Sequence, residues 1–256
     1  MFRTLFIFIL LISLPLISVA QERITDEEEA REVFSELDTR RSSIDSEMSL
    51  LNMEIINSSG RSRSRTMQSW TRNEEDGSDN LIVFTDPGNV RGTGFLSVSE
   101  GDNEIQRLYL PSLGRIQTIG AAEKDDQFMG SDFTYEDLGD QDPDDYEFEW
   151  LEIGDTLYTV RASKPESEQY SFVEFDIEKE RYALREVRYF NQEGELIKRL
   201  VAEDFEQVTD SLWSPRKMTM YDLRDDRRTV LTWQEREVNA DIPEWRFTER
   251  GLRRGV

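Results

Sequence analysis

Carboxylates are the commonest reactive side chains in this sequence, and four of them lie between Asp140 and Asp145. Asp140, Asp142 and Asp144 follow the D-x-D-x-D order of a calcium-binding loop. Asp145, however, stands where such a loop requires glycine, and Pro143 stiffens the backbone. We therefore interpret this segment as a solvated acidic loop, with calcium binding as the alternative.

The chain contains no histidine and no cysteine. This composition removes the commonest general base and zinc ligand, and it excludes disulfides, thiolate sites and a lipid-modified cysteine anchor. There is no G-x-S-x-G nucleophile turn, and no carboxylate stands alone in an apolar setting where a raised pKa would be expected. We predict a protein that is not an enzyme and that carries neither metal nor cofactor.

The overall charge is strongly negative. The chain has 54 acidic and 31 basic residues, for a formal net charge of −23. Such a surface repels nucleic acid and anionic membranes and is typical of proteins that work in high salt. We expect no nucleic-acid partner.

The segment Val90–Leu96 holds one charged group, Arg91, among apolar residues and glycines. Gly92 and Gly94 do not form a phosphate-binding loop, because the third glycine and the following helix are missing. In a strand they would instead allow backbone or ligand to approach closely. Arg91 either contacts a ligand head group or a lid, or fastens a loop through a carboxylate such as Asp132.

The N-terminal residues 1–20 have the three parts of a secretory signal. Arg3 supplies the positive charge, Leu5–Leu16 the apolar core, and Ser18–Ala20 the small residues that a signal peptidase reads. The apolar run is too short for a membrane anchor, which needs about 20 residues. We expect cleavage after Ala20, location in the periplasm, and one mature domain over residues 21–256.

One amphipathic helix is expected near the start of the mature chain. Thr25 and Glu28 can form a capping box, and an apolar stripe follows at helical spacing. The stripe comprises Ala30, Val33, Phe34 and Leu37.

The rest of the chain is dominated by short alternating segments with turns between them, which is typical of antiparallel strands. Ser62–Arg65 superficially resembles an RNA-binding tract, but its alternation favours a strand with one solvated face. Phe128–Leu138 is expected to contain a short turn or helix. The predicted strands begin at Met48 and Ser62 and continue over Leu81–Phe84, Thr93–Val98, Ile105–Leu110, Arg115–Ile119, Tyr146–Trp150, Thr156–Ala162, Ser171–Ile177, Ala183–Phe190, Leu196–Val201, Lys217–Leu223 and Arg228–Glu235.

Ten or more such strands predict an α+β, mainly β fold. We expect one large, strongly curved antiparallel sheet or an incomplete β-barrel, with an apolar face that needs a partner. The apolar residues of three central segments then either line a cavity or form a closed core. These candidates are Phe84, Phe95, Leu96, Leu108, Leu110, Phe128, Met129 and Phe133.

Three segments resemble the outer membrane lipoprotein-sorting proteins, relatives of the periplasmic carriers LolA and LolB. They are Val90–Leu96 (VRGTGFL), Leu108–Arg115 (LYLPSLGR) and Gly130–Leu138 (GSDFTYEDL), and Phe247–Leu252 resembles the family's ending. The resemblance implies an open β-barrel with helices on its concave side. It also implies the handling of lipoproteins or lipids between two membranes, with an RND-type transporter as a partner.

Together these features predict a monomeric periplasmic carrier that binds the acyl chains of lipoproteins or lipids in an apolar cavity. The helix carrying Val33, Phe34 and Leu37 would act as its lid. The alternative is a non-catalytic adaptor that docks on a transporter or outer membrane protein and carries no lipid.

Overall fold

The computed structural model describes residues 26–74, 77–100, 103–139, 143–165 and 167–256. The expected signal, its cleavage point and the Thr25 cap lie outside these residues, as do Asp140 and Asp142. None of the helices in the described ranges has the length and apolar character that crossing a membrane requires.

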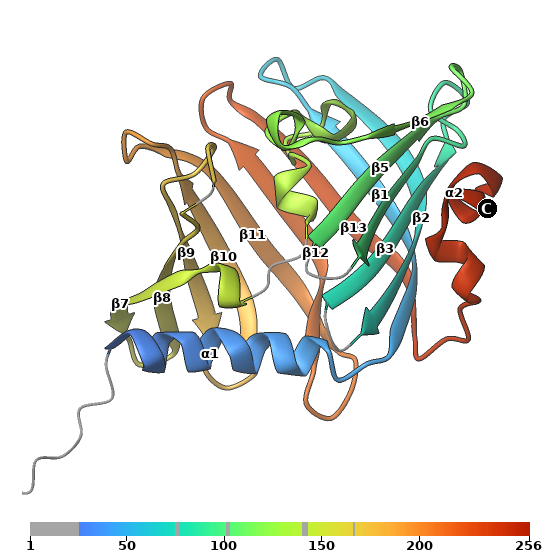
Figure 1. Cartoon of the computed structure of the whole chain (residues 1–256). Helices are drawn as coiled ribbons and strands as arrows, with labels where there is room; N and C mark the ends of the chain where they lie inside the picture. The colour runs from blue at the N-terminus through green and yellow to red at the C-terminus, as the bar shows by residue number, and fades with distance from the viewer. Residues whose placement is uncertain (1–25, 75–76, 101–102, 140–142, 166) are drawn as a thin grey trace, which may run out of the picture.

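A single antiparallel sheet of thirteen strands makes up most of the molecule (Figure 1). Its order is β6-β5-β4-β3-β2-β1-β13-β12-β11-β10-β9-β8-β7, so the two edge strands are consecutive in the chain and the sheet stays open. The strands are β1 Ser46–Ile56, β2 Ser62–Glu74, β3 Gly77–Asp86, β4 Gly94–Glu100, β5 Asn103–Leu110, β6 Arg115–Thr118, β7 Glu147–Ile153, β8 Leu157–Ser163, β9 Phe172–Glu178, β10 Ala183–Phe190, β11 Leu196–Gln207, β12 Trp213–Asp222 and β13 Arg227–Val238. The prediction of a strongly curved, incomplete barrel is confirmed.

The alternation of side chains along each strand creates two apolar faces. On β3, Ile82 and Phe84 face the concave side, whereas Leu81 and Val83 face the convex side. Register shifts between paired strands, for example at Leu50/Leu51 in β1, bend the sheet. A sheet curved in this way must be covered on both sides.

Two segments cover the concave side (Figure 1). The helix α1 (Asp26–Arg41) packs against β7 and lies across one end of the half-barrel. The segment that leaves β6, residues 119–139, runs across the concave face and is called the inner loop below. It contains the short 3-10 helices η1 Ala121–Glu123, η2 Phe128–Gly130 and η3 Glu136–Leu138, and η4 Pro143–Asp145 follows before β7.

The convex side is covered by the last residues of the chain. The 3-10 helix η5 (Glu244–Phe247) and the helix α2 (Glu249–Arg254) place Phe247 and Leu252 against β2, β3 and β4. Thr248 caps α2 by accepting a hydrogen bond from the Gly251 amide at 3.3 Å. Gly94 provides the close approach that its position in β4 suggested, because a Cβ there would lie 2.7 Å from Leu252 Cδ1.

Replacement of Gly251 by alanine should loosen this covering. A Cβ at Gly251 would meet the backbone of Trp245 and Arg246, lying 2.6 Å from the Arg246 carbonyl carbon. We expect Gly251→Ala to lower the free energy of unfolding by about 1–3 kcal/mol and to reduce amide protection in α2. Gly88→Ala is the matched control, since a Cβ there would meet nothing within 4 Å. Equal urea midpoints for the two variants would contradict the packing described.

Candidate functional site

The concave face encloses a cavity of about 470 Å³. This volume falls within the range of about 300–1,000 Å³ that is typical of small-molecule sites. The cavity lies between the central and later strands, the end of α1 and one side of the inner loop. Its wall is mainly apolar and includes Leu51, Met53, Met67, Ile82, Phe175, Leu184, Val187, Leu200, Met218, Leu231 and Trp233.

The inner loop fills the other part of the concave face with an aromatic cluster. The ring of Phe128 lies 5.8 Å from Phe84 and 5.4 Å from Phe95, and Tyr135 lies 5.7 Å from Phe128. Rings at such separations gain energy beyond the area that they bury. The loop is therefore packed as part of the core, and the cavity is the space that it leaves open.

The predicted lining residues divide into three groups. Phe95, Phe128 and Phe133 line the cavity. Phe84, Leu108, Leu110 and Met129 are packed within the cluster between the inner loop and the sheet. Leu96 was wrongly placed, because it is fully buried on the convex face with Leu252. Since Phe95 points inward, its neighbour in an extended strand must point outward.

The three residues expected to form a lid lie on the apolar face of α1. Phe34 packs against Phe148 and Phe175, with ring centroids 5.1 Å apart in both cases. Val33 is buried in the same cluster. Leu37, one turn further along, reaches the cavity wall.

Arg91 lies outside the cavity and fastens its own turn through a carboxylate, which is the second of its predicted roles, although the partner is Asp86 and not Asp132. Its side chain is 65% exposed, donates to the Thr85 carbonyl oxygen at 2.9 Å, and pairs with Asp86 at 3.2 Å. Asp132, the partner that we expected for it, is bound by Arg227 at 3.2 Å and by the Thr229 hydroxyl at 2.6 Å. Arg91 occupies the turn after β3, whereas the arginines that line the cavity are Arg41 and Arg236.

Two other arginines hold the inner loop in place. Arg65 donates to the carbonyl oxygen of Met129 at 2.6 Å, and Arg63 donates to that of Gly130 at 3.1 Å. Met129 and Gly130 both adopt positive φ angles, 52° and 71°, so the loop turns sharply where the guanidinium groups reach it. The strand predicted over Ser62–Arg65 is thus correct, and its arginines bind backbone.

A buried ionic group that sequence analysis missed connects the inner loop to the sheet. Lys198, on β11, is 1% exposed; its Nζ lies 2.9 Å from Asp137 Oδ2 and donates to Tyr170 Oη at 2.7 Å. Tyr170 Oη donates in turn to Asp137 Oδ1 at 2.8 Å, and burial raises the pKa of Tyr170 well above its ordinary value. Asp137 and Tyr170 also line the cavity. The sequence signal available for this group was the spacing of Lys198, two residues before Leu200 in a strand, which places the lysine on the same face as an inward-facing leucine.

Comparisons with known proteins agree with this geometry. A family model described only as "Uncharacterized protein" matches residues 76–254, and no curated protein matches the chain. An outer membrane lipoprotein-sorting protein domain from Vibrio parahaemolyticus has 26% identity and a TM-score of 0.83, over 88% of this chain and 99% of that one. The chain belongs to the family that this model describes, and its structural neighbours are LolA-like outer membrane lipoprotein-sorting proteins.

Two further solved structures share the fold. A DUF1329 family protein from Desulfovibrio piger has a TM-score of 0.81 at 21% identity, covering 89% of this chain and 99% of that one. A LolA superfamily protein from Nitrosomonas europaea has a TM-score of 0.68 at 18% identity, covering 86% and 97%. The long curved antiparallel sheet that is not closed into a barrel therefore matches the LolA-like fold.

The segments that resembled the family meet in space around the inner loop. Phe95 of VRGTGFL and Leu108 of LYLPSLGR pack in one cluster with Phe133 of GSDFTYEDL. Gly94, beside Phe95, receives Leu252 on the opposite face. The segments that resemble the family are thus the ones that pack the inner loop and α2 onto the sheet.

No group of acidic residues able to hold a metal is found in the part of the chain that the structure describes. Asp144 and Asp145, from the calcium-like pattern, pair instead with Arg31 at 3.2 Å and Lys164 at 2.6 Å.

Loss of the buried cation Lys198 should strongly destabilise the folded protein. Lys198→Met leaves Asp137 buried without its partner, and we expect the free energy of unfolding to fall by about 3–5 kcal/mol. Replacing both members, Lys198→Met with Asp137→Leu, should recover part of that loss. Lys217→Met is the matched control, because Lys217 pairs with Glu203 at the surface and should contribute less than about 1 kcal/mol. Urea denaturation measures all three; equal losses for the two lysine variants would rule out a special role for Lys198.

A pH dependence should arise from Glu136, which lines the cavity. Burial raises its pKa, and the negative charges of Asp137 and Asp125 add to the shift, while a hydrogen bond from Ser167 opposes it. A carboxyl group whose pKa is higher in the folded state contributes stability that is fully present below its unfolded pKa of about 4.3. That contribution is lost as the pH rises through the folded-state pKa.

Glu136→Gln should remove this loss of stability with rising pH, because glutamine does not ionise. We expect the variant to keep more of its low-pH stability than the wild type when urea midpoints are measured from pH 4 to pH 8. Glu193→Gln, in the exposed turn between β10 and β11, should follow the wild-type profile. Parallel profiles for Glu136→Gln and the wild type would refute the assignment.

Proposed function

We propose that this protein is a periplasmic carrier that binds the acyl chains of lipoproteins or lipids and takes part in their transport towards the outer membrane. The apolar cavity of about 470 Å³ is the observation that carries the proposal. Transfer of an acyl chain from water stabilises the complex by about 0.8 kcal/mol for each buried CH₂ group. Ten buried methylenes would offset much of the cost of association without any specific polar contact.

The names of the relatives support this role. The Vibrio parahaemolyticus domain is described as lipoprotein-sorting, and the Nitrosomonas europaea protein as a member of the LolA superfamily. A lipoprotein-sorting role is consistent with a protein that is not an enzyme. We propose that residues 1–20 direct export and that cleavage follows Ala20. We also propose that residues 21–256 act as a monomer with an RND-type transporter.

The helix α1 is suited to serve as the lid. It is attached near its middle by Phe34 in the cluster with Phe148 and Phe175, while Leu37 touches the cavity. Arg31 also links it to η4 by donating to the Pro143 carbonyl oxygen at 2.9 Å. A pivot about the Phe34 cluster would withdraw Leu37 from the cavity and leave the helix bound to the sheet.

Native mass spectrometry of the protein purified from the periplasm tests the carrier directly. Bound lipid-sized mass, or uptake of an acylated peptide by the stripped protein, is expected. Bare protein that takes up no acylated peptide would favour the alternative, an adaptor that docks on a transporter or outer membrane protein without lipid.

Leu200→Glu should abolish acyl binding. Leu200 is half-buried in the cavity wall, so a carboxylate there introduces charge where the acyl chain would lie. We expect the affinity for a fluorescent fatty acid to fall at least about tenfold, with the protein still folded by circular dichroism. Leu223→Glu is the matched control, because Leu223 is an exposed leucine in the turn after β12. Undiminished binding by Leu200→Glu would exclude this cavity as the acyl site.

A further inference from the structure

The residues that cover the convex face, Glu244–Val256, carry an unusual charge for this chain. They include four arginines, Arg246, Arg250, Arg253 and Arg254, against two glutamates, although the whole protein has a net charge of −23. None of the four forms an ion pair with a carboxylate in the described ranges. By contrast, Arg188 in the sheet contacts Glu174 at 3.1 Å and Asp176 at 2.6 Å.

The segment that carries these arginines is packed against the sheet. Phe247 and Leu252 are buried against the sheet, and Gly251 allows η5 and α2 to touch. Arg246 donates to the Gly255 carbonyl oxygen at 2.7 Å and lies 4.3 Å from the Trp70 ring. Arg250, Arg253 and Arg254 are exposed. Three of the four positive charges, those of Arg250, Arg253 and Arg254, are thus held on one face and exposed to solvent.

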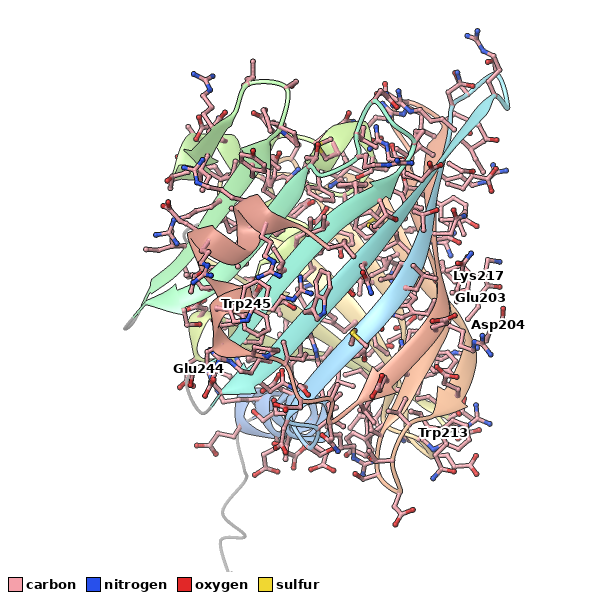
Figure 2. The ribbon with its side chains drawn as sticks, turned by 90° about the vertical axis from the view of Figure 1, so that its right-hand side faces the viewer. Glu203, Asp204, Trp213, Lys217, Glu244 and Trp245 are labelled. Carbon is pink, nitrogen blue, oxygen red and sulfur yellow. The ribbon has the colours of Figure 1, made fainter. Side chains whose placement is uncertain are left out.

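Apolar groups accompany the arginines on this face, which Figure 2 presents to the viewer with Trp245 labelled. The Trp245 ring contacts two guanidinium groups, with its centroid 4.9 Å from Arg246 Cζ and 4.8 Å from Arg254 Cζ. Arg253 donates to the Gly114 carbonyl oxygen at 3.5 Å, which connects α2 to the turn holding Leu113. Leu113 is 57% exposed and Val256 is 64% exposed. We call these residues, with the four arginines, the arginine–tryptophan face.

We propose that the arginine–tryptophan face docks the protein on membranes that contain anionic phospholipid. Guanidinium groups bind phosphate bidentately, and tryptophan is favoured at the level of lipid head groups. Arginines beside exposed apolar side chains match the chemistry of such a surface. The net charge of the chain predicts repulsion from the same membrane, so contact is confined to this face and orients the protein on the bilayer.

Vesicle sedimentation tests the proposal without any variant. The full-length mature protein should bind vesicles of phosphatidylglycerol and phosphatidylcholine, and this binding should weaken as salt is added. It should bind pure phosphatidylcholine vesicles far less. Equal binding to both vesicles, or to neither, overturns the proposal; binding to neither would direct attention to an acidic protein as the partner.

A charge-matched pair of variants localises the contact. The triple variant Arg250→Gln, Arg253→Gln, Arg254→Gln should lower the partition coefficient on anionic vesicles by about a hundredfold. The control triple variant Arg61→Gln, Arg216→Gln, Arg228→Gln removes the same charge from exposed arginines elsewhere and should bind as the wild type does. Equal weakening by both variants overturns the proposal.

The cavity variant separates this inference from the carrier role. Leu200→Glu lies on the concave side and should keep full vesicle adsorption while losing acyl binding. If Leu200→Glu also prevents adsorption, the vesicles are being bound through the cavity, and the arginine–tryptophan face is not the docking surface.

Discussion

A sheet that curls without closing must have its concave face covered by something other than its own strands. Here the inner loop supplies much of the cover, and its attachment depends on groups that are out of contact with water. Phe128 fills the space between Phe84 and Phe95, and Asp137 meets Lys198 in the core. A buried ion pair contributes little net stability when intact, but loss of one partner is costly. The pair therefore specifies where the loop sits, and so which part of the face stays open as a cavity.

Sequence alternation was sufficient to predict the architecture. Each predicted strand corresponds to a strand of the structure, because period-2 patterning and turn residues are local properties. The assignment of faces was less complete. Phe95 and Leu96 are both apolar and fully buried, because α2 covers the convex face as the inner loop covers the concave one. When both faces of a strand are buried, the alternation of side chains does not show which face is concave.

The site could be predicted only in part, because its polar contacts join distant residues. Asp132 and Thr229 are 97 residues apart, and Asp137 and Lys198 are 61 residues apart. No local pattern reports such pairs. Arg91 was the conspicuous charge in the sequence, yet its partner is five residues away at the surface. The arginines that bind the inner loop, Arg63 and Arg65, lie in the segment Ser62–Arg65. The alternation placed both on one face of β2, but it did not indicate which face meets the inner loop.

The position of β1 between β2 and β13 governs the order in which the molecule can assemble. Apart from β1 and β13, neighbouring strands in the sheet are consecutive in the chain. Two separate meanders, β1–β6 and β7–β13, can therefore form early. They unite where β1 pairs with β13, from Glu47 opposite Val238 to Ile56 opposite Arg228. The hydrogen bond from the Asp45 amide to the Asn239 side chain, across 194 residues, lies at the end of this pairing. A chain that becomes available from its first residue onward therefore acquires a continuous interior only after nearly all of it is present.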